Sequence, residues 1–153
     1  MEWALLPLKR YAEFTGRSRR KEYWMFVLLM VVVGFVAGLV EGLLGLTGMI
    51  GGVYGPISLL IGLAFLVPSI SVSIRRLHDS NRSGWWLLIV AIPYALTAGL
   101  FLSGSLVLAG VFSMISLVAV VVLLVLMVIE GTKGPNQYGP DPLEGERAAP
   151  TAT

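Results

Sequence analysis

The sequence contains no cysteine and one histidine in 153 residues. Disulfides, thiolate metal sites and cysteine lipidation are therefore excluded, as is a metal cage built from several histidines. Charge is also scarce, because Asp, Glu, Lys and Arg make up 13% of the chain against roughly 25% in ordinary soluble domains. No charged residue occurs in 23–40, 42–74 or 83–129. A soluble domain of this size could not bury such stretches, so they indicate a protein embedded in lipid.

Four apolar runs are long enough to cross a membrane as helices. We predict spans at about 23–46, 50–74, 85–102 and 106–129, each of 18 to 25 residues. A helix of that length covers a hydrocarbon core of roughly 30 Å at about 1.5 Å per residue. Helices are expected because lipid offers no partner for backbone polar groups, and the alternating pattern of a membrane β-barrel is missing.

The predicted fold class is all-α, a polytopic membrane protein with four transmembrane helices in a domain over 23–129. The preceding segment, 1–22, contains spaced aromatic and leucine residues that predict a short amphipathic piece on the membrane surface. The Gly and Pro residues of 130–143 predict a series of tight turns that form a structured cap. The small and polar residues of 144–153 predict a disordered tail.

The basic residues predict the orientation. All eleven Lys and Arg residues lie before the first span, between the second and third spans, or after the fourth span. With four spans these segments share one membrane face, which the positive-inside rule makes cytoplasmic. We therefore expect both termini in the cytoplasm and anionic membrane lipids as partners, since each basic residue at the surface gains about 1 kcal/mol from them. This topology explains the sequence pI of about 9.2, and no nucleic-acid partner is expected.

The first span combines a glycine stripe with an acidic residue. Gly34, Gly38 and Gly42 form two overlapping G-x-x-x-G steps, and Gly45 extends the stripe. Such a stripe lets another helix approach closely, so it predicts helix packing and offers a route to a homo-oligomer. Glu41 lies on the same side of the helix. It is either an intramembrane proton or ion site, or a carboxylate near the outer interface that reaches water.

The second span contains a proline followed by alternating serines, Pro68 and then Ser69, Ser71 and Ser73. Proline lacks an N–H and frees the carbonyl four residues before it. The favoured interpretation is that the serine hydroxyls repair this kink or bond a neighbouring helix. The alternative is a polar substrate path through the span.

Three short polar stretches, at 14–24, 75–86 and 131–142, belong to the predicted cytoplasmic face. The candidates for a polar network or a headgroup site are Arg17, Arg20, Glu22, Arg75, Arg76, His78, Asp79, Asn136, Tyr138 and Asp141. The interpretation with the fewest assumptions is that the acids pair with the arginines and lock the three stretches together. A site for an anionic headgroup or another phosphate is the second interpretation, and a catalytic centre is the third.

The spacing of the polar residues gives little support to any specific chemistry. His78 next to Asp79 invites acid–base catalysis, but adjacent helical residues point about 100° apart and no nucleophile can be placed beside them. Gly131 to Asn136 lacks the spacing of a phosphate loop. The acids that could gather around a divalent cation have no fixed spacing. We therefore expect no catalytic residue, no metal and no cofactor.

The same stretches contain three motifs, G-R-x-x-R-x-E-Y-W at 16–24, R-R-L-H-D-x-x-x-S-G-W-W at 75–86 and G-T-x-G-x-N-x-Y-G-P-D-P at 131–142. In order and spacing they resemble the bacterial family called domain of unknown function 805, the YhaH-like proteins. The resemblance covers about residues 10–143. It implies a four-span protein of the bacterial inner membrane, with no established activity, substrate or catalytic residue.

Two function classes follow. The first is a non-enzymatic module that binds lipid or a partner through a conformationally fixed basic cytoplasmic face. The alternative is a transporter or channel-like subunit with Glu41 and the Ser69, Ser71 and Ser73 region on its path. A membrane enzyme that acts on lipid headgroups ranks third.

Overall fold

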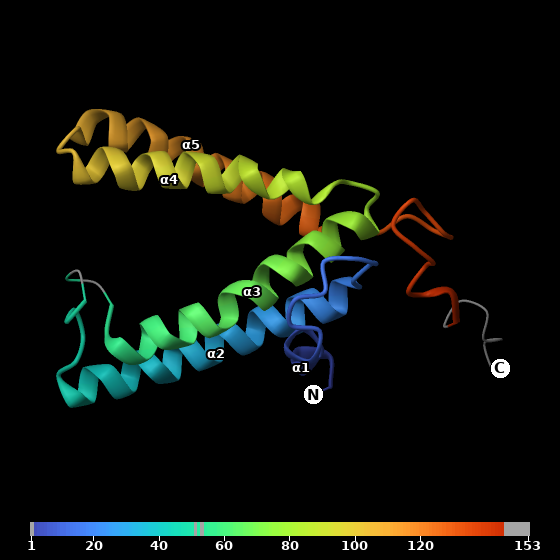
Figure 1. Cartoon of the computed structure of the whole chain (residues 1–153), viewed down its shortest axis with the longest axis horizontal. Helices are drawn as coiled ribbons and strands as arrows, with labels where there is room; N and C mark the ends of the chain where they lie inside the picture. The colour runs from blue at the N-terminus through green and yellow to red at the C-terminus, as the bar shows by residue number, and fades with distance from the viewer. Residues whose placement is uncertain (1, 51, 53, 146–153) are drawn as a thin grey trace. The chain divides into compact units, whose positions relative to one another are not determined.

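The computed structural model of the chain describes residues 2–50, 52 and 54–145. It is 71% helix, and its described residues contain no β-strand. The elements are α1 (Glu2–Lys9), α2 (Arg20–Leu44), α3 (Pro56–Asp79), the 3-10 helix η1 (Gly84–Leu87), α4 (Leu88–Leu102) and α5 (Leu106–Val128) (Figure 1). The described residues contain four helices that are each long and apolar enough to cross a membrane: α2, α3, η1 together with α4, and α5. The predicted all-α class with four spanning helices is confirmed.

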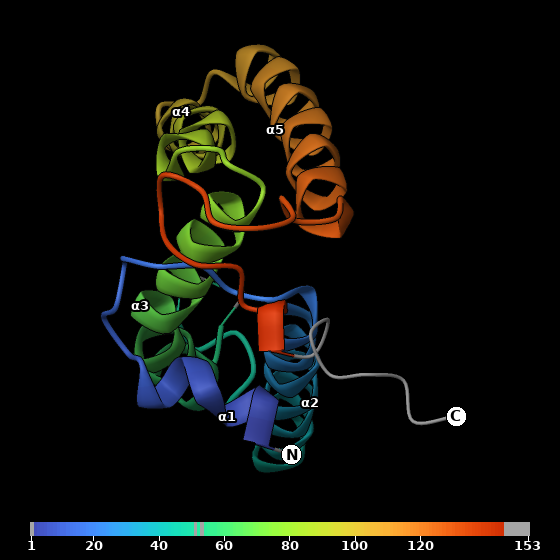
Figure 2. The same ribbon diagram turned by 90° about the vertical axis from the view of Figure 1, so that its right-hand side faces the viewer.

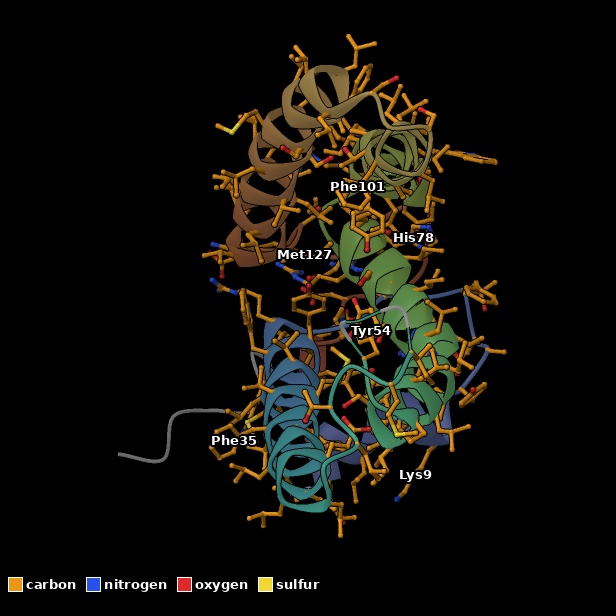
Figure 3. All side chains as sticks on the ribbon, turned by 90° about the vertical axis from the view of Figure 1, so that its left-hand side faces the viewer. Lys9, Phe35, Tyr54, His78, Phe101 and Met127 are labelled. Carbon is orange, nitrogen blue, oxygen red and sulfur yellow. The ribbon has the colours of Figure 1, made fainter. Side chains whose placement is uncertain are left out.

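The spanning helices expose apolar side chains along most of their length. In the most apolar 18-residue stretch of each spanning helix, no more than 17% is buried inside the structure. Leu43, Leu102 and Val107 are each more than 80% exposed, and Phe35 points away from α2 (Figure 3). Leaving such surface in water would cost about 25 cal/mol per Å². Lipid is therefore the solvent that this surface requires.

The chain forms two compact units. The first comprises Met1–Phe14 and Arg20–Val72, and the second comprises Thr15–Arg19 and Ser73–Thr153. Helix α3 contributes residues to both units, because the boundary follows Val72.

In the first unit, α2 and α3 lie side by side and run in opposite directions (Figures 1 and 2). The rings of Phe26 and Phe65 stack between them, with centroids 5.8 Å apart. The short helix α1 lies against α2, where Lys21 Nζ is 5.5 Å from the ring centroid of Trp3. Pro7 is fully buried, so α1 forms part of this unit's small core.

Helix α3 begins at Pro56, later than the predicted residue 50. Reciprocal backbone hydrogen bonds of 2.9 and 3.1 Å between Ile50 and Tyr54 fold these residues into a tight turn. Proline suits the first helical position, because its missing N–H is one that has no helical acceptor there. The apolar composition of this turn made it part of the predicted span.

Helix α3 also ends later than predicted, so Arg75 and Arg76 lie on the helix and not in a connecting loop. It ends in a Schellman motif, in which Arg82 N–H donates to the Leu77 carbonyl at 2.9 Å and Asn81 N–H donates to the His78 carbonyl at 3.0 Å. Asn81 has a φ of 57°, a left-handed conformation that asparagine tolerates.

In the second unit, α4 and α5 form an antiparallel hairpin (Figures 1 and 2). They are joined at Gly104, whose φ is 78°. Gly84 begins η1 against α3, and a Cβ there would lie 2.9 Å from the Ile74 side chain. Of the predicted tail, residues 146–153 lie outside the described part of the chain.

Candidate functional site

The candidate site is centred on the carboxylate of Asp79 in the second unit. Its Oδ1 accepts a 3.0 Å hydrogen bond from Arg17 Nε, and its Oδ2 accepts one from Arg76 Nη1. The side chains of these two arginines and of Asp79 are at most 7% exposed. Both carboxylate oxygens are thus paired with a cation in a buried environment, where such hydrogen bonds are strong.

Arg17 connects Asp79 to the segment 130–143, which we call the cap. Its Nη1 donates to the Gly134 carbonyl at 2.7 Å, and its Nη2 donates to the Thr132 carbonyl at 2.5 Å. With its Nε on Asp79, every nitrogen of the guanidinium has a protein acceptor. The planar group therefore fixes the cap against the end of α3.

Arg76 caps the C-terminus of α5. Its Nε donates to the Met127 carbonyl at 3.1 Å, and its Nη2 donates to the Ile129 carbonyl. The last four carbonyls of a helix have no helical donor, and they form the negative end of its dipole. A cation from α3 thus satisfies the end of another spanning helix.

The cap also bonds the backbone at the end of α3. Thr132 donates to the Asp79 carbonyl from its N–H at 2.9 Å and from its hydroxyl at 3.1 Å. Asn136 Nδ2 donates to the His78 carbonyl at 2.9 Å. We call Arg17, Arg76, Asp79, Thr132 and Asn136 the cap network.

Turns shape the cap itself. Asp141 accepts from Gly134 N–H at 3.0 Å and from Leu143 N–H at 2.9 Å, so it orders the cap backbone. A Cβ on Gly131 would overlap the Asp79 carboxylate. Glycine is therefore the residue that lets the cap backbone approach this buried acid.

His78 stands at the edge of the cap network and faces an aromatic ring. It stacks on Tyr138 with ring centroids 3.8 Å apart and an angle of 3° between the planes. Its Nδ1 lies 3.2 Å from the Gly16 carbonyl oxygen. Both contacts hold the imidazole in place, and neither presents it to a nucleophile. In the described residues, no three His, Asp or Glu side chains gather where a metal ion could bind.

The structure places three further predicted members at the start of α2 and on α3. Arg20 and Glu22 stand in the first turn of α2, in the first unit, where Glu22 is buried. Arg75 is fully buried, and its backbone carbonyl accepts Ser18 N–H at 3.0 Å.

Glu41 caps a helix within the first unit. Its Oε1 accepts from Ser58 N–H at 2.8 Å, and its Oε2 accepts from the Ser58 hydroxyl at 2.6 Å. Ser58 lies in the first turn of α3, where N–H groups lack helical acceptors and the dipole favours an anion. Gly55 immediately precedes α3, and a Cβ there would overlap the Glu41 carboxylate. This arrangement favours a structural role for the intramembrane acid.

The serines of α3 bond backbone and neighbouring side chains. Ser69 donates to the Phe65 carbonyl at 2.6 Å and to Met30 Sδ at 3.1 Å. Ser71 donates to the Glu13 carbonyl at 2.6 Å. These contacts favour packing over a substrate path.

The glycine stripe is open. A Cβ on Gly34 or Gly38 would meet no atom within 4 Å, and one on Gly42 would meet only Thr47 Oγ1 at 4.0 Å. Gly45 has a φ of 69° and ends α2. The stripe therefore provides no close helix contact among the described residues.

Sequence reasoning missed several residues that complete the site. Thr132 and Gly131 belong to the third motif but carry no charge, and Ser58 lies in an apolar span. The only signal for Gly131 was that it is a glycine, the residue that permits close approach of the backbone.

Comparisons with known proteins agree with a membrane protein. A family model described as protein of unknown function, DUF805, matches residues 11–140. The inner membrane protein YhaH of Escherichia coli (strain K12) is 37% identical over 142 residues, which cover 93% of this chain and 97% of the relative. The inner membrane protein YhaI of the same strain is 38% identical over 145 residues, 95% and 98% of the two chains. The uncharacterized protein YiiR of that strain is 29% identical over 138 residues, 84% of each. No solved structure matches the chain.

Proposed function

We propose that this chain, which belongs to the DUF805 family, is a non-enzymatic protein that binds anionic phospholipid at its basic end. The family is one of unknown function, and this chain is a multi-pass helical protein of the inner membrane. The proposal places the basic end on the cytoplasmic side, in accordance with the positive-inside rule.

The observation that carries the proposal is a set of exposed cations in the first unit. Lys9, Arg10 and Lys21, which we call the basic collar, are all exposed on or next to α1 and the start of α2. Exposed aromatic side chains accompany them: Tyr11, Phe14 and Trp24. Aromatic rings favour the headgroup level of a membrane, and surface cations attract anionic lipid by about 1 kcal/mol each.

The cap network supports a division between cations that stabilise the structure and cations that bind lipid. Arg17 and Arg76 already bond Asp79 and four backbone carbonyls, so they need no headgroup. These two predicted headgroup candidates are thus better explained as structure, and lipid contact is left to the exposed cations. The stacked and hydrogen-bonded His78 gives no support to a catalytic role.

Native mass spectrometry of the purified protein with added phosphatidylglycerol or phosphatidylcholine tests this proposal. The wild type should retain more phosphatidylglycerol. The triple variant Lys9→Gln, Arg10→Gln, Lys21→Gln should lose at least about tenfold in affinity, since three cations contribute about 1 kcal/mol each. Lys133→Gln, which removes a single exposed cation outside the collar, is the control and should lose no more than about fivefold. Equal retention of the two lipids, or an unchanged triple variant, would contradict the proposal.

A further inference from the structure

A groove runs between the start of the third spanning helix and α5 in the second unit. Its volume is about 520 Å³. The side chains that line it are apolar and include Trp86, Ile89, Met114, Ile115, Val118 and Ala119. A second hollow, lined by Ser83, Trp85, Trp86 and Ile89, adjoins it through the two shared residues. The second hollow is mostly apolar as well, and Ser83 adds one hydroxyl to its lining.

Ser83 directly follows a cation that has no acidic partner among the described residues. Arg82 immediately precedes Ser83 and is half-buried. Its guanidinium makes one long hydrogen bond, 3.4 Å from Nη1 to the Ser80 carbonyl, and no carboxylate in the described part of the chain pairs with it. This contrasts with Arg17 and Arg76, whose charge is balanced by Asp79. A half-buried cation one residue from the lining of these hollows favours an anion as its partner.

The length of the groove indicates what fills its interior. Met114 and Val122 mark its extent along α5. These residues are eight positions apart, which corresponds to about 12 Å of helix. A spanning helix would need a surface of roughly 30 Å. The groove is thus too short for a transmembrane helix of a partner and suits part of one acyl chain.

We infer that this groove is a binding site for one glycerophospholipid with an anionic headgroup. The acyl chain lies along Met114, Val118 and Ala119, and the headgroup phosphate lies at Arg82 and the Ser83 hydroxyl. Trp85 and Trp86 flank the junction of headgroup and chain, the level that tryptophan prefers. This site belongs to the second unit and is separate from the basic collar, so each can fail without the other.

Photocrosslinking of the purified full chain tests the site. The probe is a phosphatidylglycerol with a diazirine on its acyl chain, and mass spectrometry of peptides locates the adducts. We expect adducts concentrated on residues 114–122. Ala119→Leu fills the groove and should remove most of them, whereas Ala95→Leu, on an exposed part of α4 outside the groove, should not. The triple variant of the basic collar should label this peptide as the wild type does.

A second variant tests the headgroup contact without disturbing the packing. Arg82→Gln should reduce labelling by the phosphatidylglycerol probe about fivefold, the effect of one cation on an anionic lipid. Labelling by a matching phosphatidylcholine probe should stay unchanged. The proposal is wrong if adducts spread evenly over the exposed faces of α4 and α5, or if both probes respond equally to Arg82→Gln. It is also wrong if Ala119→Leu alters the mass of the detergent-solubilised assembly and leaves lipid adducts in place, because the groove would then hold a second copy.

Discussion

The hydroxyl of Tyr11 donates a 2.9 Å hydrogen bond to the carbonyl oxygen of Ala64. This carbonyl lacks its helical donor, because the residue four positions later is Pro68. The sequence had favoured the serines after Pro68 for this repair, but Ser69 donates to the Phe65 carbonyl. The segment before the first spanning helix thus completes the hydrogen bonding of the second.

Tyr11→Phe should lower the free energy of unfolding by about 0.5–1.5 kcal/mol, since it removes one hydrogen bond to a backbone carbonyl. In a Pro68→Ala background the helix regains its own donor to Ala64, so the loss from Tyr11→Phe should shrink. Unfolding in mixed micelles followed by circular dichroism measures both effects. Tyr94→Phe is the matched control, because the Tyr94 hydroxyl makes no hydrogen bond in the described part of the chain. Equal losses in the two backgrounds would show that Tyr11 acts by packing alone.

The cap network should respond strongly to the loss of one partner. Arg76→Ala and Asp79→Ala should each cost about 3–5 kcal/mol, because each leaves a buried charge without its partner. The double variant should cost less than the sum of the two. The exposed pair of Arg10 and Glu13, 3.4 Å apart, is the control, and Arg10→Ala should cost no more than about 1 kcal/mol. If Arg76→Ala and Asp79→Ala each cost less than about 1 kcal/mol and their effects add in the double variant, the cap network is contradicted.

Gly131→Ala should destabilise the protein by about 1–3 kcal/mol, because the added methyl group overlaps the carboxylate of Asp79 and something must move. Gly110→Ala on α5 should act in the opposite direction. Nothing lies within 4 Å of a Cβ on Gly110, and alanine favours a helix by about 0.5–1 kcal/mol over glycine. Thermal unfolding of the two single variants gives the comparison. If Gly131→Ala and Gly110→Ala shifted the melting temperature in the same direction, the cap backbone would be more adaptable than its close approach to Asp79 implies.

Gly55→Ala should lower the melting temperature, because the new methyl group displaces the Glu41 carboxylate from the first turn of α3. Glu41→Ala should also lower it, since Ser58 N–H loses its acceptor. With Glu41→Ala already present, Gly55→Ala should cost little more. Gly38→Ala, at an open position, serves as the control. If Gly55→Ala lowers the melting temperature by the same amount with and without Glu41→Ala, the two residues are not coupled. Glycine at position 55 would then not be needed to accommodate the Glu41 carboxylate.

Labelling of single cysteines tests the topology, and the absence of natural cysteine makes each variant a clean reporter. Thr47→Cys and Ser103→Cys should react with a membrane-impermeant maleimide in intact cells. Lys133→Cys, at an exposed position of the cap, should react only after permeabilisation. Ser80, in the connection between the second and third spans, is a poor reporter because it is buried. Reaction of Lys133→Cys in intact cells would reverse the proposed orientation.

The spanning helices were predictable because charge and apolarity are properties of the sequence itself. Helix α5 ends at Val128, one residue before the predicted end, where the uncharged stretch gives way to Glu130. The start of α3 was not predictable in this way. The turn at Ile50 and Tyr54 is as apolar as a span, and only backbone hydrogen bonding separates it from helix.

The candidate site was predictable in part for the same reason. Pairing of the acids with Arg17, Arg20, Arg75 or Arg76 was expected from charge, and the structure places Arg17 and Arg76 on the carboxylate of Asp79. The carbonyls of Met127 and Gly134 could not be foreseen as partners, because every residue has a carbonyl and only the fold decides which ones lack a donor. The role of Gly131 likewise becomes visible only when the position of Asp79 is known.

The capping of α5 by Arg76 has a consequence for biosynthesis. Arg76 precedes its acceptor Met127 by 51 residues, and the ribosome delivers the chain from its N-terminus. Until the fourth helix arrives, the guanidinium of Arg76 has neither the Met127 carbonyl nor the Ile129 carbonyl as an acceptor. A chain that stops before Met127 keeps the ion pair of Arg76 with Asp79 but lacks these two acceptors, so the hydrogen bonding of the second span is completed only after the fourth has been made.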